Sequence, residues 1–224
     1  MSPCALSGAV TTWLGSQAVG FILGVIAGVA APLIVEWFKS AAKVRKASSA
    51  LIVEVEAART MALVNAWTIQ ESRGARTPFV AGALLEALHG DRVRADLLGE
   101  TRLADLARLA TDQALIEQRN KNDSQRGIAI AVRIGTPFFT ATPSILGDLP
   151  TTLARRVANL YASIEVANAA ADGLTEWDRR RLGLPEQEAR REVQRHAHEQ
   201  AQVEELNRIV VQSADEVIRE LRKR

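Results

Sequence analysis

The chain has 224 residues, a formal net charge of +2 and one cysteine, Cys4. So small a net charge provides no strong field for nucleic acid or an acidic substrate, and we expect no nucleic-acid partner. A single cysteine excludes an intramolecular disulfide and any metal site that needs two cysteine ligands.

The first 35 residues contain no Asp, Glu, Lys or Arg, and a group of cations follows them. As a helix, the apolar stretch 13–37 would reach about 37 Å, enough to cross a hydrocarbon core of about 30 Å. We therefore predict a transmembrane helix over 13–37, preceded by a short extracytoplasmic N-terminus over 1–12. The residues predicted to contact the membrane surface are Trp13, Trp37, Lys39, Lys43, Arg45 and Lys46.

A cleaved secretory signal peptide is the main alternative for this stretch. Signal peptides begin with a positively charged region, which this N-terminus lacks. Cations follow the predicted span and none precede it, so the positive-inside rule places the N-terminus outside and the remainder in the cytoplasm. The abundance of Arg and Ala is typical of GC-rich bacterial genomes. We therefore expect a protein of the bacterial inner (cytoplasmic) membrane.

Within the predicted span, small residues recur every four positions and share one helix face: Ser16, Gly20, Gly24 and Gly28. Such a row allows a second helix backbone to approach closely, which predicts helix–helix packing in the membrane and self-association. The alternative is that the row faces lipid, since glycine is common in membrane helices.

The remainder of the chain predicts an all-α fold, with a helical cytoplasmic domain over 38–184. Residues 33–73 contain neither Gly nor Pro, so the membrane helix is expected to continue into the cytoplasm. We expect further helices from Thr77-Pro78 to about Gly90, from Thr101 to about Arg119, and from Pro150 to Gly173. Residues 120–127 read as a polar linker. The expected buried stripe of the first helix is Val44, Leu51, Val55, Ala58, Ala62 and Ile69.

The segment 127–147 contains one charged residue, Arg133, and two prolines. A second membrane span has to be considered, but a central arginine would cost at least about 2.5 kcal/mol there. We favour a core segment or an element that grazes the membrane.

The last 40 residues, 185–224, predict a long helix that begins at Pro185 and carries a heptad-like stripe. Its expected partner is the first helix, the helix after Pro150 or a second copy of the chain. Acid-first pairs such as Glu204/Arg208 and Asp215/Arg219 are expected on its outer surface. The coiled-coil-like seam comprises Val193, Val203, Val210, Val217 and Leu221, with polar His196, Gln200 and Asn207 between them.

One tripeptide occurs twice, as Thr77-Pro78-Phe79 and as Thr136-Pro137-Phe138. The repetition suggests either a duplicated helix–TPF–helix unit or two independent uses of a common helix start, and we favour the second.

No phosphate-binding glycine loop, nucleophile elbow or zinc-binding helix motif is present. His196 and His198 diverge on a helix, as do Glu54 and Glu56, so neither pair predicts a metal site or a paired-carboxylate site. We expect no catalytic residue, no metal and no cofactor.

Two classes of function follow. The first is a membrane-anchored helical interaction, scaffold or regulatory protein, whose partners are the lipid bilayer, a second copy and an unidentified protein. The second is an oligomeric pore-forming or membrane-perturbing effector, assembled through the glycine face of the transmembrane helix. An enzyme with a site assembled from scattered polar residues is the least favoured reading.

Overall fold

The computed structural model describes residues 45–89, 100–123, 131–181 and 186–223. These residues form helices and connecting segments without a β-strand, which confirms the predicted all-α class. The chain divides into two units, Met1–Ala47 and Ser48–Arg224. Among the described helices, none combines the length and the apolar character needed to cross a bilayer. The predicted span at 13–37 lies outside the described residues.

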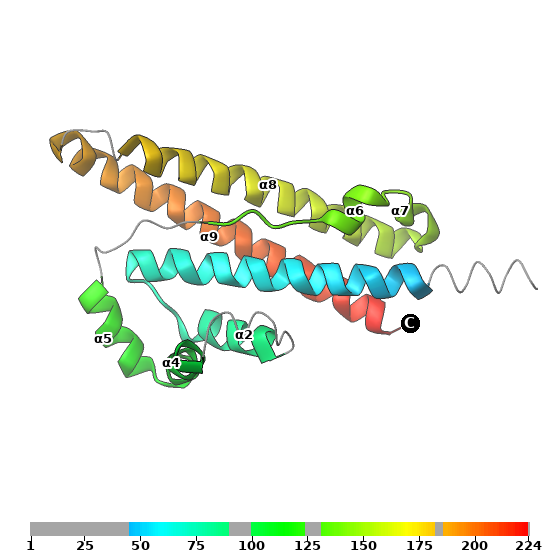
Figure 1. Ribbon diagram of the computed structural model, residues 1–224, viewed down its shortest axis with the longest axis horizontal. Helices are drawn as coiled ribbons and strands as arrows, with labels where there is room; N and C mark the ends of the chain where they lie inside the picture. The colour runs from blue at the N-terminus through cyan, green and yellow to red at the C-terminus, as the bar shows by residue number, and fades with distance from the viewer. Residues whose placement is uncertain (1–44, 90–99, 124–130, 182–185, 224) are drawn as a thin grey trace, which may run out of the picture. The chain divides into compact units, whose positions relative to one another are not determined.

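Three long helices form the framework of the larger unit (Figure 1). They are a helix over residues 45–73, α8 (Thr151–Arg181) and α9 (Glu186–Arg222). The sequence left three candidate partners open for the last helix. Hydrogen bonds and ion pairs join α9 to both of the other long helices of the same chain.

Ion pairs fix the direction of α9 against the 45–73 helix. Arg73 Nη1 lies 2.8 Å from Glu204 Oε2, and Arg59 Nε lies 2.6 Å from Asp215 Oδ1. Arg59, the earlier of the two arginines, pairs with Asp215, the later of the two acids. The two helices are therefore antiparallel. Both acids were expected to pair within α9. They pair across the helix interface instead.

The predicted apolar stripes face this interface. Polar members of the α9 stripe are buried together with the apolar ones, and they find partners there. Gln200 Nε2 donates to Ser72 Oγ over 3.4 Å, and Asn65 Nδ2 donates to Asn207 Oδ1 over 3.4 Å. The buried residues from the two predicted stripes are Leu51, Val55, Ala58, Ala62, Ile69, His196, Gln200, Val203, Asn207, Val210, Ala214, Val217 and Leu221.

The first helix ends and the next begins as predicted. Gly74 adopts a positive φ of 61°, the left-handed conformation that suits a glycine after a helix C-terminus. Helix α2 (Pro78–His89) then starts with Pro78 at its first position, and Thr77 Oγ1 accepts a hydrogen bond from the Val80 amide over 3.4 Å. Thr77 is therefore the N-cap residue.

The helix predicted over 101–119 is two helices, α4 (Glu100–Thr111) and α5 (Gln113–Asp123). Asp112 separates them, because its carboxylate accepts a hydrogen bond from the Leu115 amide over 2.9 Å and so starts a new helix. The polar linker predicted from Asn120 is also corrected, since α5 continues through residues 120–123. α2 and α4 pack against each other.

Helix α8 does not stop at Gly173, where the sequence predicted its end, but continues to Arg181. Ala171 and Leu174, on either side of the glycine, are both buried. Tertiary packing of these neighbours outweighs the weak helix propensity of one glycine, which is worth about 1 kcal/mol.

The ambiguous segment is described from residue 131 and forms no continuous helix. Residues 131–136 form no regular secondary structure, and two short helices follow, α6 (Pro137–Ala141) and α7 (Ile145–Asp148). Ala131 and Ile145 are buried, as expected of a core segment. Ala131 joins a cluster with Ile69, Ala171, Leu174 and Val203, drawn from all three long helices.

Candidate functional site: the pocket between α6 and α8

Residues 131–136, which belong to no helix or strand, are held by side chains of two helices. Asn65 of the 45–73 helix donates to the Val132 carbonyl over 2.8 Å and accepts from the Val132 amide over 2.9 Å. Asn168 of α8 does the same for Ile134, accepting over 2.7 Å and donating over 3.1 Å. We call residues 131–136 the strap. Each asparagine satisfies a complete backbone unit, so the strap is fixed to two different helices.

A buried carboxylate fixes the start of α6. Thr136, at the N-cap position, makes no side-chain cap bond. Glu54 takes over this role from the 45–73 helix: its Oε2 accepts the Phe138 amide over 2.5 Å and its Oε1 accepts the Phe139 amide over 3.1 Å. A negative charge at the first free amides of a helix is stabilising.

Glu54 also receives the hydroxyl of Tyr161, which donates to Oε1 over 2.5 Å. The Tyr161 ring lies parallel to that of Phe139, with the ring centroids 3.7 Å apart. Burial is the main cause that raises the pKa of the Tyr161 phenol far above its usual value, and the bond to Glu54 and the charge of Glu54 raise it further. Tyr161 therefore keeps its proton at any physiological pH.

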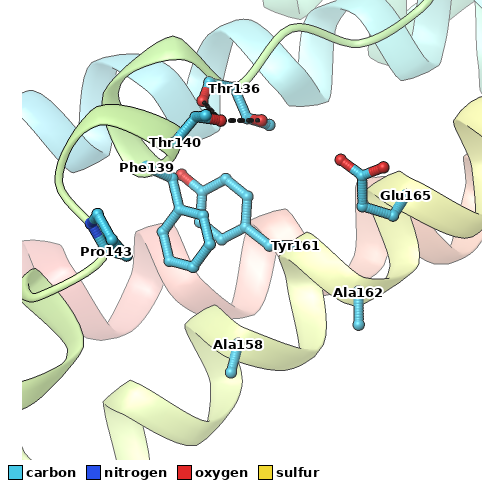
Figure 2. Close-up of a pocket in the computed structure, with 8 residues that line it drawn as sticks. All are labelled: Thr136, Phe139, Thr140, Pro143, Ala158, Tyr161, Ala162 and Glu165. Atoms are coloured by element: carbon cyan, nitrogen blue, oxygen red, sulfur yellow. Dashed lines mark hydrogen bonds between the residues drawn. The ribbon is translucent and has the colours of Figure 1, made fainter.

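These contacts form one wall of a pocket of about 360 Å³ between α6 and α8 (Figure 2). Figure 2 shows the rings of Phe139 and Tyr161 overlapping, with Ala158 and Ala162 on the same helix as Tyr161. The α8 residues are spaced by three and four positions, so they share one face of that helix. The lining residues are Thr136, Phe139, Thr140 and Pro143 from the strap and the α6 region, and Ala158, Tyr161, Ala162 and Glu165 from α8.

The polar groups of the lining are the hydroxyls of Thr136, Thr140 and Tyr161 and the carboxylate of Glu165. The lining residues include no histidine, cysteine, lysine or serine, and the Tyr161 hydroxyl is engaged by Glu54. Thr140 Oγ1 donates to the Thr136 carbonyl over 2.7 Å. The lining therefore contains neither a cysteine or serine nucleophile nor a histidine base. Across the described parts of the chain, no group of three His, Cys, Asp or Glu side chains is arranged to hold a metal ion.

A second cavity of about 480 Å³ lies between α8 and α9. Trp177 lines it and stacks on His196 with ring centroids 3.7 Å apart. Glu176 and Glu199 contribute carboxylates to the same cavity. The stacked pair explains how a histidine is accommodated in the α9 stripe, as a buried packing residue bonded to Gln200.

The predicted site residues do not gather at either cavity as a set. Arg45 and Lys46 are exposed at the start of the 45–73 helix. The seam residues Val203, Val210, Val217 and Leu221 are buried, and Val203 also lines the second cavity. The structure does not describe the side chains of the other predicted site residues. They are Trp13, Ser16, Gly20, Gly24, Gly28, Trp37, Lys39, Lys43 and Val193.

Sequence reasoning missed the group around Glu54. The sequence showed only that Glu54 and Glu56 diverge on a helix, whereas the structure buries Glu54, which is 7% exposed. A signal was present: Glu54 lies three residues after Leu51 and four before Ala58, on the edge of the predicted buried stripe. Asn65 likewise lies between Ala62 and Ile69 of that stripe. A polar residue in such a position needs a partner, although its spacing does not reveal which one.

No protein-family model, no curated protein and no solved structure matches this chain.

Proposed function

We propose that the protein is a membrane-anchored helical interaction or regulatory protein. The observation that carries this proposal is the uncharged stretch of the first 35 residues followed by Lys39, Lys43, Arg45 and Lys46. The anchor would span 13–37, with the N-terminus outside the bacterial inner membrane and the helical unit in the cytoplasm. Its partners would be the bilayer, a second copy and a further protein.

The helical unit supports a role in binding more than one in catalysis. Its buried polar groups serve other polar groups of the fold: Asn65 and Asn168 hold the strap, and Glu54 holds α6. The α6–α8 pocket has apolar walls and no paired nucleophile and base among its lining residues. A rigid framework that presents a pocket is what a docking or regulatory protein requires.

The membrane part is tested by fractionating cells that express the full chain with a C-terminal reporter. Because the anchor would be an integral span, the protein should stay in the membrane pellet after carbonate extraction, with the reporter protected from protease added outside. A matched variant with Gly24→Arg, which puts a charge into the predicted span, should reduce membrane insertion. Full-length protein in the carbonate supernatant would contradict the proposal.

The row of small residues in the predicted span supports a second candidate function, a pore-forming effector. Ser16, Gly20, Gly24 and Gly28 would let several spans pack closely. For this candidate, Gly24→Leu should abolish both higher oligomers and ion leakage from vesicles that contain the protein. Vesicles that do not leak with the wild-type chain would exclude the pore and leave the interaction role.

The interaction role needs a test that leaves α9 in place. Deleting residues 185–224 would remove a helix whose stripe is buried against its own chain, so the loss of a partner would only report unfolding. Site-specific crosslinking from exposed positions avoids this problem. Phe79 on α2 and Val166 on α8 are 70% and 53% exposed. A crosslink to a second copy or to one defined protein supports the role, and its absence from both positions opposes it.

A further inference from the structure

We propose that the pocket between α6 and α8 binds an organic cation with an apolar body, such as a quaternary ammonium group. This goes beyond an interaction role, because it assigns a ligand class to one site. The argument depends on the walls of the pocket, on its charge and on the carboxylate behind its aromatic wall.

The walls suit an apolar body. Phe139 and Tyr161 form a parallel stack on one side, and Ala158 and Ala162 contribute only methyl groups on the α8 side (Figure 2). The volume of about 360 Å³ falls within the range of small-molecule sites, roughly 300–1,000 Å³. Aromatic faces carry negative quadrupole charge and attract cations, most strongly those that are weakly hydrated.

The charge of the lining has one sign. Glu165 is the only formally charged residue among those that line the pocket, and no lysine, arginine or histidine is among them. Its side chain is exposed and takes part in no hydrogen bond or ion pair with another residue of the described chain. A ligand cation beside Glu165 would therefore gain an ion pair without breaking one that already exists.

A second carboxylate stands behind the aromatic wall. Glu54 accepts the Tyr161 hydroxyl over 2.5 Å and lies in the buried part of the fold. Its negative charge makes the Tyr161 ring richer in electrons and adds to the potential that a cation would meet in the pocket. An anionic ligand would be repelled by the carboxylates of Glu165 and Glu54, and the lining contains no cationic side chain to attract it.

The test is a titration of the full chain in nanodiscs, with alanine methyl groups labelled for NMR and choline as the probe. The neutral isostere 3,3-dimethylbutan-1-ol has nearly the same shape without the charge. We expect choline to shift the Ala158 and Ala162 signals in a saturable manner and to bind about tenfold more tightly than the alcohol. Equal affinity for the two compounds, or no saturable shift with choline, would overturn the proposal.

Two matched pairs of variants locate the site. Glu165→Gln should weaken choline binding several-fold, whereas Glu86→Gln, which removes an exposed carboxylate on α2, should leave it unchanged. Ala162→Leu should fill the pocket and abolish binding, whereas Ala169→Leu, also at an exposed alanine of α8, should not. All four positions lie outside the buried core, and circular dichroism confirms that each variant folds. Choline binding that survives both Glu165→Gln and Ala162→Leu would place the cation elsewhere.

Discussion

The two Thr-Pro-Phe segments begin helices by different means. At Thr77 the cap is mainly local: its own hydroxyl accepts the Val80 amide, and Gln70, seven residues earlier, accepts the Thr77 amide over 3.1 Å. At Thr136 no side-chain cap bond forms, and Glu54, more than 80 residues away in the sequence, accepts the amides of α6. An identical tripeptide is therefore satisfied by its neighbours in one place and by tertiary structure in the other.

The elements before and after the two segments also differ. The first follows the 45–73 helix and starts the 12-residue α2, whereas the second begins at the last residue of the strap and starts the five-residue α6. Phe79 is 70% exposed, while its counterpart Phe138 is half-buried. These contrasts oppose a duplicated helix–TPF–helix unit and favour two independent uses of a common helix start.

The largest effect should come from breaking the tertiary cap. Glu54→Leu leaves the amides of α6 and the Tyr161 hydroxyl without their acceptor, and we expect the free energy of unfolding to fall by roughly 3 kcal/mol. Urea unfolding followed by circular dichroism measures this change. Glu56→Leu, two positions along the same helix at an exposed ion pair with Arg222, is the matched control and should cost under about 1 kcal/mol. Equal losses would show that Glu54 contributes no more than a surface residue.

Removing one clamp of the strap should have the next largest effect. Asn168→Ala leaves the amide and the carbonyl of Ile134 unpaired in a buried position, at a cost of about 2 kcal/mol. Asn159 lies on the same helix with an exposed side chain, so Asn159→Ala provides the control. A loss at position 168 no greater than at position 159 would mean that the strap does not depend on this asparagine.

Alkaline pH should weaken the tertiary cap through Tyr161. Tyr161 is the only tyrosine of the chain, and its pKa is raised in the folded state. The protonated phenol contributes its full stabilisation of the fold below the pKa of tyrosine in the unfolded chain, near 10. This contribution is lost as the pH rises toward the higher pKa of the folded state. At pH 11 the loss should be about 1.4 kcal/mol, and it should be absent in Tyr161→Phe.

Absorbance near 295 nm provides a direct check, because it reports tyrosinate from one residue. The folded protein at pH 10.5 should show little tyrosinate, and unfolding in urea at the same pH should release the signal. Full ionisation of the folded protein near pH 10 would contradict the buried bond to Glu54. Glu54→Gln should lower the pKa of Tyr161 only in part, because burial is the larger cause.

The smallest effect compares the two threonines directly. Thr77→Val should cost about 1 kcal/mol because it removes a cap bond, whereas Thr136→Val should stay within about 0.5 kcal/mol. Both are threonines followed by proline, so helix propensity cancels in the comparison. Equal costs would mean that the 3.4 Å contact at Thr77 contributes nothing as a cap.

Patterns that depend on near neighbours could be predicted from the sequence. The period of the stripe located the buried side of α9 even where it carries His196, Gln200 and Asn207, and Pro78 located the start of α2. Asp112 could also have been recognised as a helix N-cap. The apolar spacing of Leu103, Leu106, Ala110 and Ala114 runs past Asp112 and favours one longer helix instead.

The pocket could not be predicted, because each of its determinants joins distant parts of the chain. Glu54 and Tyr161 lie 107 positions apart, and Asn65 reaches Val132 across 67. Nothing in the spacing of one helix specifies which distant amide or hydroxyl a buried side chain will meet. The overrun of α8 past Gly173 has the same origin, since the packing of Leu174 decides it.

The strap and the start of α6 have a consequence for hydrogen exchange. The amides of Val132, Ile134, Phe138 and Phe139 all donate to side chains of the 45–73 helix or α8. In the least regular stretch of the described chain, amide protons should thus exchange slowly, at rates set by the separation of the long helices. The rate of deuterium uptake at these four positions therefore measures how often the whole bundle opens.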